Sequence, residues 1–134
     1  MNLHKSTRYA LYAAMEMAQA EPGSAITVGQ VAERYRVPGG ALAKVFQQLV
    51  RAGIAAGTRG VGGGYRLARR PSELTVLDVI NAFEPPRTAG KCLLADSSED
   101  CGRYVACRLG RLFHEVDALS RNTFASITLE TLIK

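Results

Sequence analysis

Three cysteines lie close together in the last third of this chain of 134 residues. They are Cys92, Cys101 and Cys107, separated by eight and then five residues. Thiolates are the ligands that iron–sulfur clusters require, and zinc accepts them when a histidine or carboxylate completes the set. The spacing matches neither a zinc ribbon nor a thioredoxin-like pair. The pattern indicates a cluster site, and the alternative is three small apolar residues that are neighbours by chance.

The cysteine count also bears on the compartment. Three thiols cannot all pair within one chain, which argues against a disulfide scaffold and for a reducing environment. No apolar run approaches the roughly 20 residues that span a bilayer. The N-terminus leads into an alanine-rich amphipathic stretch without a small-residue cleavage site. We therefore expect a cytoplasmic protein with no membrane association.

The charge is unevenly spread along the chain. Residues 1–70 carry ten Lys or Arg against three Glu, and residues 71–134 carry seven against nine acidic residues, which gives +7 and −2 of the total +5. A basic half suggests that one end meets a polyanion, although a solvated basic surface would give the same composition. We do not expect an enzyme, because no nucleophile–base pair is evident and the glycines at 60–64 lack the Lys-Ser/Thr of a phosphate loop.

Three helices are predicted in the basic half. The first has an apolar stripe and ends at residues 21–24, which read Glu-Pro-Gly-Ser. Thr27 and Gln30 have the spacing of a capping box that begins the second. A break at residues 37–40 separates it from the third, which Gly53 ends. The stripe of the first helix is Leu11, Ala14, Met15 and Ala18, widened by Tyr9 and Tyr12; that of the second is Val28, Val31, Ala32 and Tyr35; that of the third is Leu42, Val45, Phe46, Leu49 and Val50.

A basic, glycine-tipped hairpin follows the third helix directly. Residues 54–59 are expected to form one strand, residues 60–64 the turn and residues 65–67 the return strand. A helix-turn-helix followed by such a hairpin is a winged helix. The sequence therefore predicts a mainly α fold with a small β-hairpin wing.

The rest of the chain predicts two more helices around the cysteines. Thr75 begins a fourth helix, which Pro85 and Pro86 stop. Residues 85–102 are rich in Pro, Gly, Ser and Asp and are expected to form a loop. A long helix is expected from Arg103, with a narrow apolar stripe that needs a partner surface, most simply a second copy of the chain. The fourth helix is expected to bury Val76, Val79, Ile80 and Phe83, and the stripe of the long helix is Val105, Leu109, Leu112, Phe113, Val116 and Leu119.

These elements divide the chain into three parts. Residues 1–84 are expected to form a winged helix-turn-helix DNA-binding domain and residues 85–102 a cysteine-bearing sensor loop. Residues 103–134 are expected to form the dimerisation helix and a C-terminal segment, of which residues 127–130 pack back on the body.

Candidate DNA contacts lie on the third helix and the wing. Gln pairs with adenine and Lys with guanine in a major groove. The first turn, Gly39-Gly40-Ala41, has almost no side chain, so we expect its amides to face phosphate. A thin glycine hairpin lets an arginine enter a minor groove, which singles out Arg59. The candidates on the third helix are Lys44, Gln47, Gln48 and Arg51. The candidates for phosphate contacts after the turn of the wing are Arg66, Arg69 and Arg70. For each of these residues the alternative is a solvated side chain.

The segment 58–69, TRGVGGGYRLAR, resembles the wing of the Rrf-type family of bacterial transcription regulators, the IscR, NsrR, RirA and CymR type. Residues 8–12 (RYALY), 31–33 (VAE) before 37–38 (VP), and 74–80 (LTVLDVI) match in order as well. The resemblance covers almost the whole chain. It implies a homodimeric winged-helix regulator on a palindromic double-stranded DNA operator. Members with three cysteines in this loop usually bind a 2Fe–2S or 4Fe–4S cluster.

The ligand set departs from the family pattern at two places. The gap from Cys92 to Cys101 is longer than in the nitric-oxide and cluster-assembly sensors. Where some members have a histidine ligand this chain has Gly110, and where others have an acidic residue from the partner chain it has Arg8, whose guanidinium does not ligate iron. We therefore expect three-cysteine ligation with the fourth position left open. Weaker candidates for that position are His4, His114, Asp96, Glu99 and Asp100.

Three functional hypotheses follow from these residues. The first is an iron–sulfur cluster-dependent transcription regulator, a repressor that senses iron, redox or nitric oxide status. The alternative is a cluster-free regulator of the same fold that senses thiol oxidation through the same cysteines. A third is an interaction protein whose winged helix docks on a metabolic enzyme, for which DNA binding would be absent or insensitive to salt.

Overall fold

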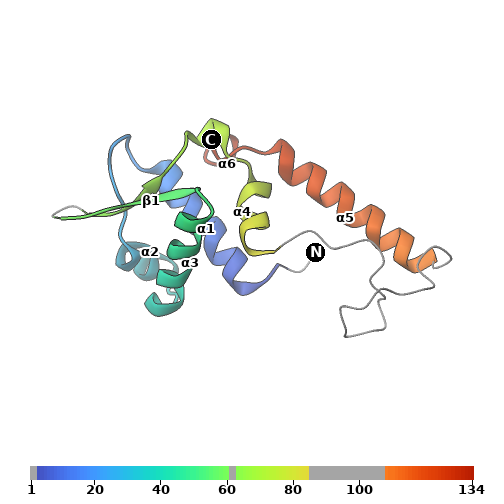
Figure 1. Cartoon of the computed structure of the whole chain (residues 1–134), viewed down its shortest axis with the longest axis horizontal. Helices are drawn as coiled ribbons and strands as arrows, with labels where there is room; N and C mark the ends of the chain where they lie inside the picture. Colours follow the sequence, from blue (N-terminus) through green and yellow to red (C-terminus); the bar gives the residue numbers. More distant parts are fainter. Residues whose placement is uncertain (1–2, 61–62, 85–107) are drawn as a thin grey trace.

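The computed structural model describes residues 3–60, 63–84 and 108–134. It is mostly helical with one antiparallel hairpin, so the predicted fold class is confirmed (Figure 1). The hairpin and the first turn of α5 lie at opposite ends of the longest axis. The described elements are α1 (Lys5–Gln19), α2 (Val28–Tyr35), α3 (Gly39–Arg51), β1 (Ala55–Thr58), β2 (Gly64–Leu67), the 3-10 turn η1 (Pro71–Glu73), α4 (Val76–Phe83), α5 (Arg108–Ser126) and α6 (Leu129–Leu132).

Two helices begin at reciprocal threonine caps. At the start of α2, the Gln30 amide N–H donates to the Thr27 hydroxyl at 3.1 Å and the Thr27 amide donates to the Gln30 side chain at 2.9 Å. Thr75 and Asp78 make the same pair of bonds at the start of α4, at 3.1 and 2.9 Å. Each box satisfies two backbone donors that a helix start leaves unpaired. Both predicted helix starts are confirmed.

The core is built around an alanine face of α1. Its buried residues are Thr7, Ala10, Ala13, Ala14, Met17 and Ala18. The predicted stripe is rotated from this face, because Leu11 and Met15 are only partly buried and Tyr12 is 47% exposed. Small side chains let α3 and α4 pack closely on α1, and a periodicity weighted towards large residues misses such a face.

The third and fourth helices bury most of the residues expected of them. Leu42, Val45, Phe46 and Leu49 of α3 are buried, and so are Val76, Val79 and Ile80 of α4. Two predictions need correction: Val50 is 38% exposed and Phe83 is only partly buried. Both lie near the C-terminal end of their helix, where the packed face reaches the edge of the body.

The hairpin is attached to the body by a third backbone segment. Strands β1 and β2 pair antiparallel, with Ala55 opposite Leu67 and Thr58 opposite Gly64. On the other side of β2, the Ile26 amide donates to the Tyr65 carbonyl at 2.9 Å and the Tyr65 amide donates to the Ile26 carbonyl at 2.7 Å. The segment between α1 and α2 therefore completes the base of the wing.

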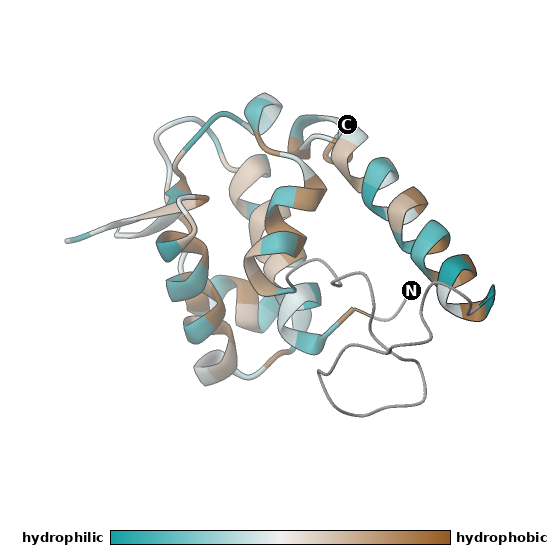
Figure 2. Ribbon diagram, turned by 45° about the vertical axis from the view of Figure 1, so that its right-hand side comes forward, coloured by the Kyte–Doolittle hydropathy of each residue, from teal (hydrophilic) through white to brown (hydrophobic). Residues whose placement is uncertain are grey.

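The C-terminal segment returns to the helical body, as expected. Leu129 is fully buried, and its amide donates to the Leu74 carbonyl at 2.8 Å. An isolated antiparallel bridge joins Thr75 to Thr128. The helix that precedes this segment, α5, projects away from the other helices (Figure 2). Among the described residues, no helix is long and apolar enough to cross a membrane.

Candidate nucleic-acid interface

The turn between α2 and α3 sets the direction of the third helix. Arg36 ends α2 in the left-handed conformation, at φ 54°. The Val37 amide then donates to the Ala32 carbonyl at 3.1 Å, and Pro38 is the N-cap residue of α3. Because proline cannot continue α2 as a helix, the chain changes direction here and begins α3 on a new axis.

The first turn of α3 is open on its outer side. A Cβ added at Gly39 or Gly40 would meet nothing within 4 Å. Pro38 offers no side-chain acceptor, so no cap bond covers the first amides of the helix. A backbone this bare can approach a phosphate closely, although the predicted phosphate contact stays a prediction.

Of the residues proposed to read bases on α3, Lys44 and Gln47 are exposed. Gln48 is only partly buried on a different face. Its side-chain amide donates to the Ala82 carbonyl of α4 at 3.2 Å, and its oxygen accepts from Arg51 Nη1 at 3.3 Å. Gln48 thus joins α3 to α4, and the exposed Arg51 side chain donates a hydrogen bond to it. Arg51 is exposed as well, and base contacts by Lys44, Gln47, Gln48 and Arg51 all stay predictions.

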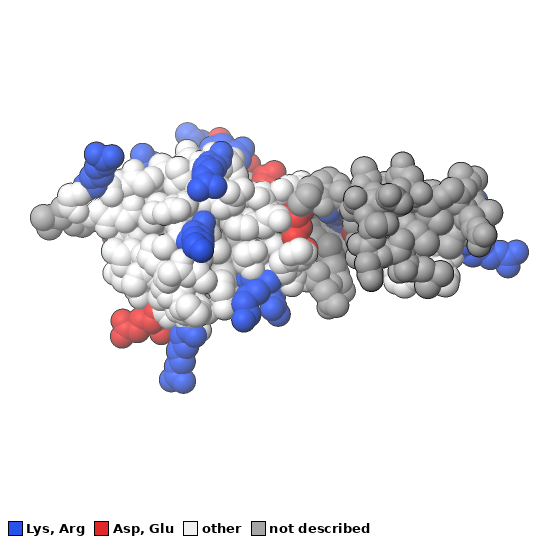
Figure 3. All heavy atoms as spheres, turned by 60° about the horizontal axis from the view of Figure 1, so that its bottom comes forward, with Lys and Arg blue, Asp and Glu red and all other residues white. Residues whose placement is uncertain are grey.

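The wing carries Arg59 and Arg66, both exposed. Arg66 lies opposite Ala56 in the hairpin, and Arg59 follows the end of β1 directly. The hairpin is thin near its end, because a Cβ at Gly63 would lie 2.8 Å from the carbonyl oxygens of both Thr58 and Gly60. Figure 3 shows Lys and Arg side chains projecting from this face of the winged-helix body, with fewer acidic side chains among them.

Sequence reasoning missed a polar cluster that joins α1 to α2. The Tyr35 hydroxyl donates to Glu16 Oε1 at 2.5 Å, and Arg34 Nη1 pairs with Glu16 Oε2 at 2.8 Å. The Tyr12 ring lies against the Tyr35 ring, with centroids 4.7 Å apart. Burial, followed by the hydrogen bond to Glu16, raises the pKa of Tyr35 to about 12. The cluster keeps the first helix of the helix-turn-helix against the core.

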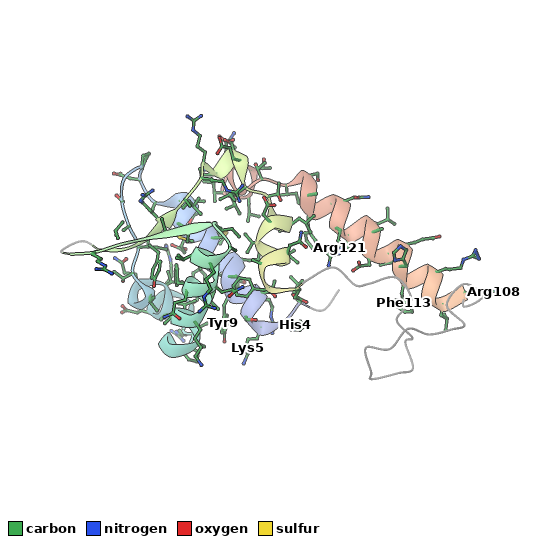
Figure 4. All side chains as sticks on the ribbon, in the orientation of Figure 1. His4, Lys5, Tyr9, Arg108, Phe113 and Arg121 are labelled. Atoms are coloured by element: carbon green, nitrogen blue, oxygen red, sulfur yellow. The ribbon has the colours of Figure 1, made fainter. Side chains whose placement is uncertain are left out.

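All three cysteines lie outside the described residues, and so do Asp96, Glu99 and Asp100. Within the described ranges, no group of three or more His, Cys, Asp or Glu is arranged to hold a metal. Gly110 is buried and has no ligating side chain, and Arg8 is exposed. His4, at the start of α1 in Figure 4, has its backbone N–H 3.1 Å from Glu84 Oε2 and its Nε2 3.4 Å from Oε1.

The long helix presents an apolar face to solvent. Its stripe residues are between 48% and 67% exposed: Leu109, Leu112, Phe113, Val116 and Leu119. The other side of the helix is attached to the body by Arg121, whose Nη1 donates to Asn81 Oδ1 of α4 at 2.7 Å and whose Nε pairs with Asp117 at 3.1 Å. Figure 4 places Arg121 close to α4, and Phe113 and Arg108 further out along the helix.

A helix-turn-helix whose second helix packs against a two-stranded wing defines a winged-helix domain. Two solved structures share this fold over almost the whole chain. The oxidized form of Staphylococcus aureus CymR has a TM-score of 0.79 and 23% identity, and covers 100% of this chain and 97% of its own. T. potens IscR has a TM-score of 0.78 and 23% identity, with 99% and 86% covered.

The family follows from the sequence comparisons. The chain belongs to the Rrf2 family of iron-dependent transcriptional regulators, whose model matches residues 3–134. It is 37% identical to the helix-turn-helix transcriptional regulator BadM of Rhodopseudomonas palustris, over all of this chain and 82% of that protein. It is 30% identical to the transcriptional regulator IscR of Photobacterium profundum, over all of this chain and 76% of that protein. The protein is therefore a DNA-binding transcriptional regulator and not an enzyme.

Proposed function

We propose that this regulator reads DNA with two elements of each subunit. In this proposal α3 enters the major groove, where Lys44 and Gln47 contact base edges, and Arg59 enters the adjacent minor groove. Arg66 and the bare amides of the first turn of α3 hold phosphates. The observation that carries the proposal is the pair of exposed α3 side chains beside an arginine-bearing wing, in a chain of this family.

Substitution of Arg59 tests this assignment. Arg59→Ala removes a charged contact from the minor groove, so we expect affinity for a selected operator duplex to fall by about 5- to 100-fold. Lys134→Ala removes the same charge at the far end of the chain and serves as the matched control. Fluorescence anisotropy at fixed salt measures both. Equal affinities for the two variants would remove Arg59 from the interface.

We further propose that the protein acts as a homodimer through α5 on a palindromic operator. The exposed apolar stripe from Leu109 to Leu119 supports this, because a helix with one unpaired apolar face gains most from packing on its own copy. Two subunits would then present two α3 helices and two wings to successive half-sites.

Sensing is proposed to depend on an iron–sulfur cluster held by Cys92, Cys101 and Cys107. The donor set fits, because three thiolates are suitable cluster ligands. The described residues supply no family-type fourth ligand, since position 110 is a buried glycine and position 8 an arginine. When bound, the cluster supplies an iron that responds to oxidants, nitric oxide and iron supply. Glu84, whose carboxylate accepts from the His4 backbone, ties α4 to α1 directly before the cysteine-bearing segment.

Anaerobic purification with iron analysis and absorbance spectroscopy tests the cluster. We expect a coloured protein that loses its iron in Cys92→Ala, Cys101→Ala and Cys107→Ala, while His114→Ala keeps it. A colourless protein without iron after reconstitution would exclude this cofactor.

The second candidate is a regulator that senses thiol oxidation through the same cysteines. One solved structure of the same fold, CymR of Staphylococcus aureus, is of an oxidized form, which supports considering it. A mild oxidant added to the iron-free protein would then accept two electrons and two protons from two of these thiols as they form a disulfide, which lowers the mass by two hydrogen atoms and changes operator affinity. The Cys107→Ser variant would report whether that residue takes part.

A further inference from the structure

An aromatic pair joins the wing to α3. The ring of Tyr65, on β2, stacks on the ring of Phe46, on α3, with centroids 4.7 Å apart and planes 24° from parallel. Phe46 is fully buried, so its ring is held by the core on the opposite side. Stacked aromatic pairs prefer a defined offset and orientation, so this contact constrains the position of β2 relative to α3 more than an aliphatic contact would.

The backbone of the same residue is also held. Both polar backbone groups of Tyr65 bond to Ile26, at 2.9 and 2.7 Å. The preceding residue must be glycine for this approach, because a Cβ at Gly64 would overlap the Ile26 carbonyl oxygen and lie 2.8 Å from its carbon. Tyr65 is thus fixed by its ring to α3 and by its main chain to the segment between α1 and α2.

Arg59 is close to this anchor along the hairpin ladder. Gly57 pairs with Tyr65 and Thr58 with Gly64. The Thr58 hydroxyl accepts from the Gly64 amide at 3.0 Å, which closes the last pair before Arg59. The position of Arg59 relative to α3 is therefore set within two ladder pairs of the Tyr65 ring.

We propose that Tyr65 is a positioning residue for DNA recognition. Its ring holds the wing at one offset from α3, so that Arg59 reaches the minor groove while Lys44 and Gln47 occupy the major groove. The inference rests on the proposed function of Arg59. It assigns to Tyr65 no contact with DNA and no part in sensing.

A double-mutant cycle tests the proposal with a duplex selected from a randomised pool by the wild-type protein. Tyr65→Leu removes the ring, and we expect it to weaken binding about 10-fold in the wild-type background and less than about 2-fold in the Arg59→Ala background. Tyr65→Phe keeps the ring, and within the described part of the chain its lost hydroxyl has no hydrogen-bond partner. Tyr65→Phe should therefore bind like the wild type.

The outcomes separate this inference from the one on which it rests. Wild-type protein that selects no duplex would refute the proposed DNA contacts themselves. Equal losses from Tyr65→Leu in both backgrounds would show a general effect on the fold and overturn the positioning role, and so would a Tyr65→Phe variant as weak as Tyr65→Leu. Circular dichroism checks folding, and Tyr65→Met, which fills the space without a flat ring, takes the place of a leucine variant that does not fold.

Discussion

At the scale of single residues, Tyr35 has the most strongly shifted pKa in the described part of the chain. Its pKa is raised from its ordinary value near 10 to about 12, first by burial and then by the hydrogen bond to Glu16. The folded state therefore keeps the phenol proton at pH values where the unfolded chain releases it. The resulting stability is fully present below pH 10 and is lost as the pH rises from about 10 to about 12.

Tyr35→Phe removes this dependence. We expect the free energy of unfolding of the wild type to fall more steeply than that of the variant between pH 10 and 12. At neutral pH the variant should be less stable by about 1–3 kcal/mol, because it loses a hydrogen bond to a charged acceptor. Urea unfolding at several pH values measures both effects. Tyr9→Phe serves as the comparison, because within the described part of the chain the Tyr9 hydroxyl has no carboxylate partner. Parallel pH profiles for Tyr35→Phe and wild type would contradict the assignment.

Single residues also show where sequence reasoning stops. The Thr27–Gln30 box is predictable because both partners lie within four positions and their chemistry is local. The role of Gln48 is not, because its partner is the Ala82 carbonyl, 34 positions away. A glutamine on a helix face is equally suited to a base edge or a carbonyl, and the bond to Ala82 depends on the packing of α4 on α3, which the local sequence does not reveal.

At the scale of elements, α6 is short but well anchored. Thr128 caps it by accepting from the Thr131 amide at 3.1 Å, and Leu129 fills the core beside Leu74. Leu129→Ala leaves a cavity, so we expect a loss of about 2–5 kcal/mol in unfolding free energy. Leu132→Ala, three positions on and 40% exposed, should cost less than about 1 kcal/mol. Thermal and urea unfolding compare the two, and similar losses would mean that α6 does not contribute to the core as described.

The exposed apolar face of α5 leads to a prediction about assembly and not about the stability of the core. Leu112→Glu combined with Val116→Glu places two charges on the exposed apolar face without touching the body. We expect sedimentation velocity to show a monomer for this variant and a dimer for the wild type, because charges do not pack in an apolar helix interface. Glu115→Gln, on the same helix, should leave the dimer intact. A wild-type monomer would refute the proposed assembly.

The buried face of a helix was predictable from the sequence where large apolar residues recur at helical spacing. It was not predictable where the face is set by contacts with distant parts of the chain. The faces of α3 and α4 follow from large residues at helical spacing. The buried face of α1 does not, since alanines such as Ala10 and Ala13 give a weak signal. The Ile26–Tyr65 bridge is one pair long and has no period at all. Cys92, Cys101 and Cys107 stay predicted from the sequence alone.

At the scale of the whole molecule, the basic half predicts binding that falls steeply with salt. Each phosphate neutralised contributes about 0.9 to the slope of log affinity against log salt concentration. If two subunits each use Arg66 on phosphate, Arg66→Ala should reduce the slope by about 2, and by about 1 if a single subunit binds. Lys134→Ala should leave it unchanged. Salt titrations of operator binding measure the slopes, and an unchanged slope for Arg66→Ala would remove that residue from the phosphate contacts.

The bridge between Thr75 and Thr128 has a topological consequence. The Val76 amide donates to the Ile127 carbonyl at 2.9 Å, so the start of α4 and the segment after α5 are neighbours. The folded unit is therefore discontinuous along the chain, because α1 to α4 share one core with Leu129 of the C-terminal segment while α5 projects from it. The stretch between α4 and the C-terminal segment can change in length at little cost in stability, because the entropy of closing an excursion between two anchored ends changes only slowly with its length. One DNA-reading body can in this way carry different excursions without being rebuilt.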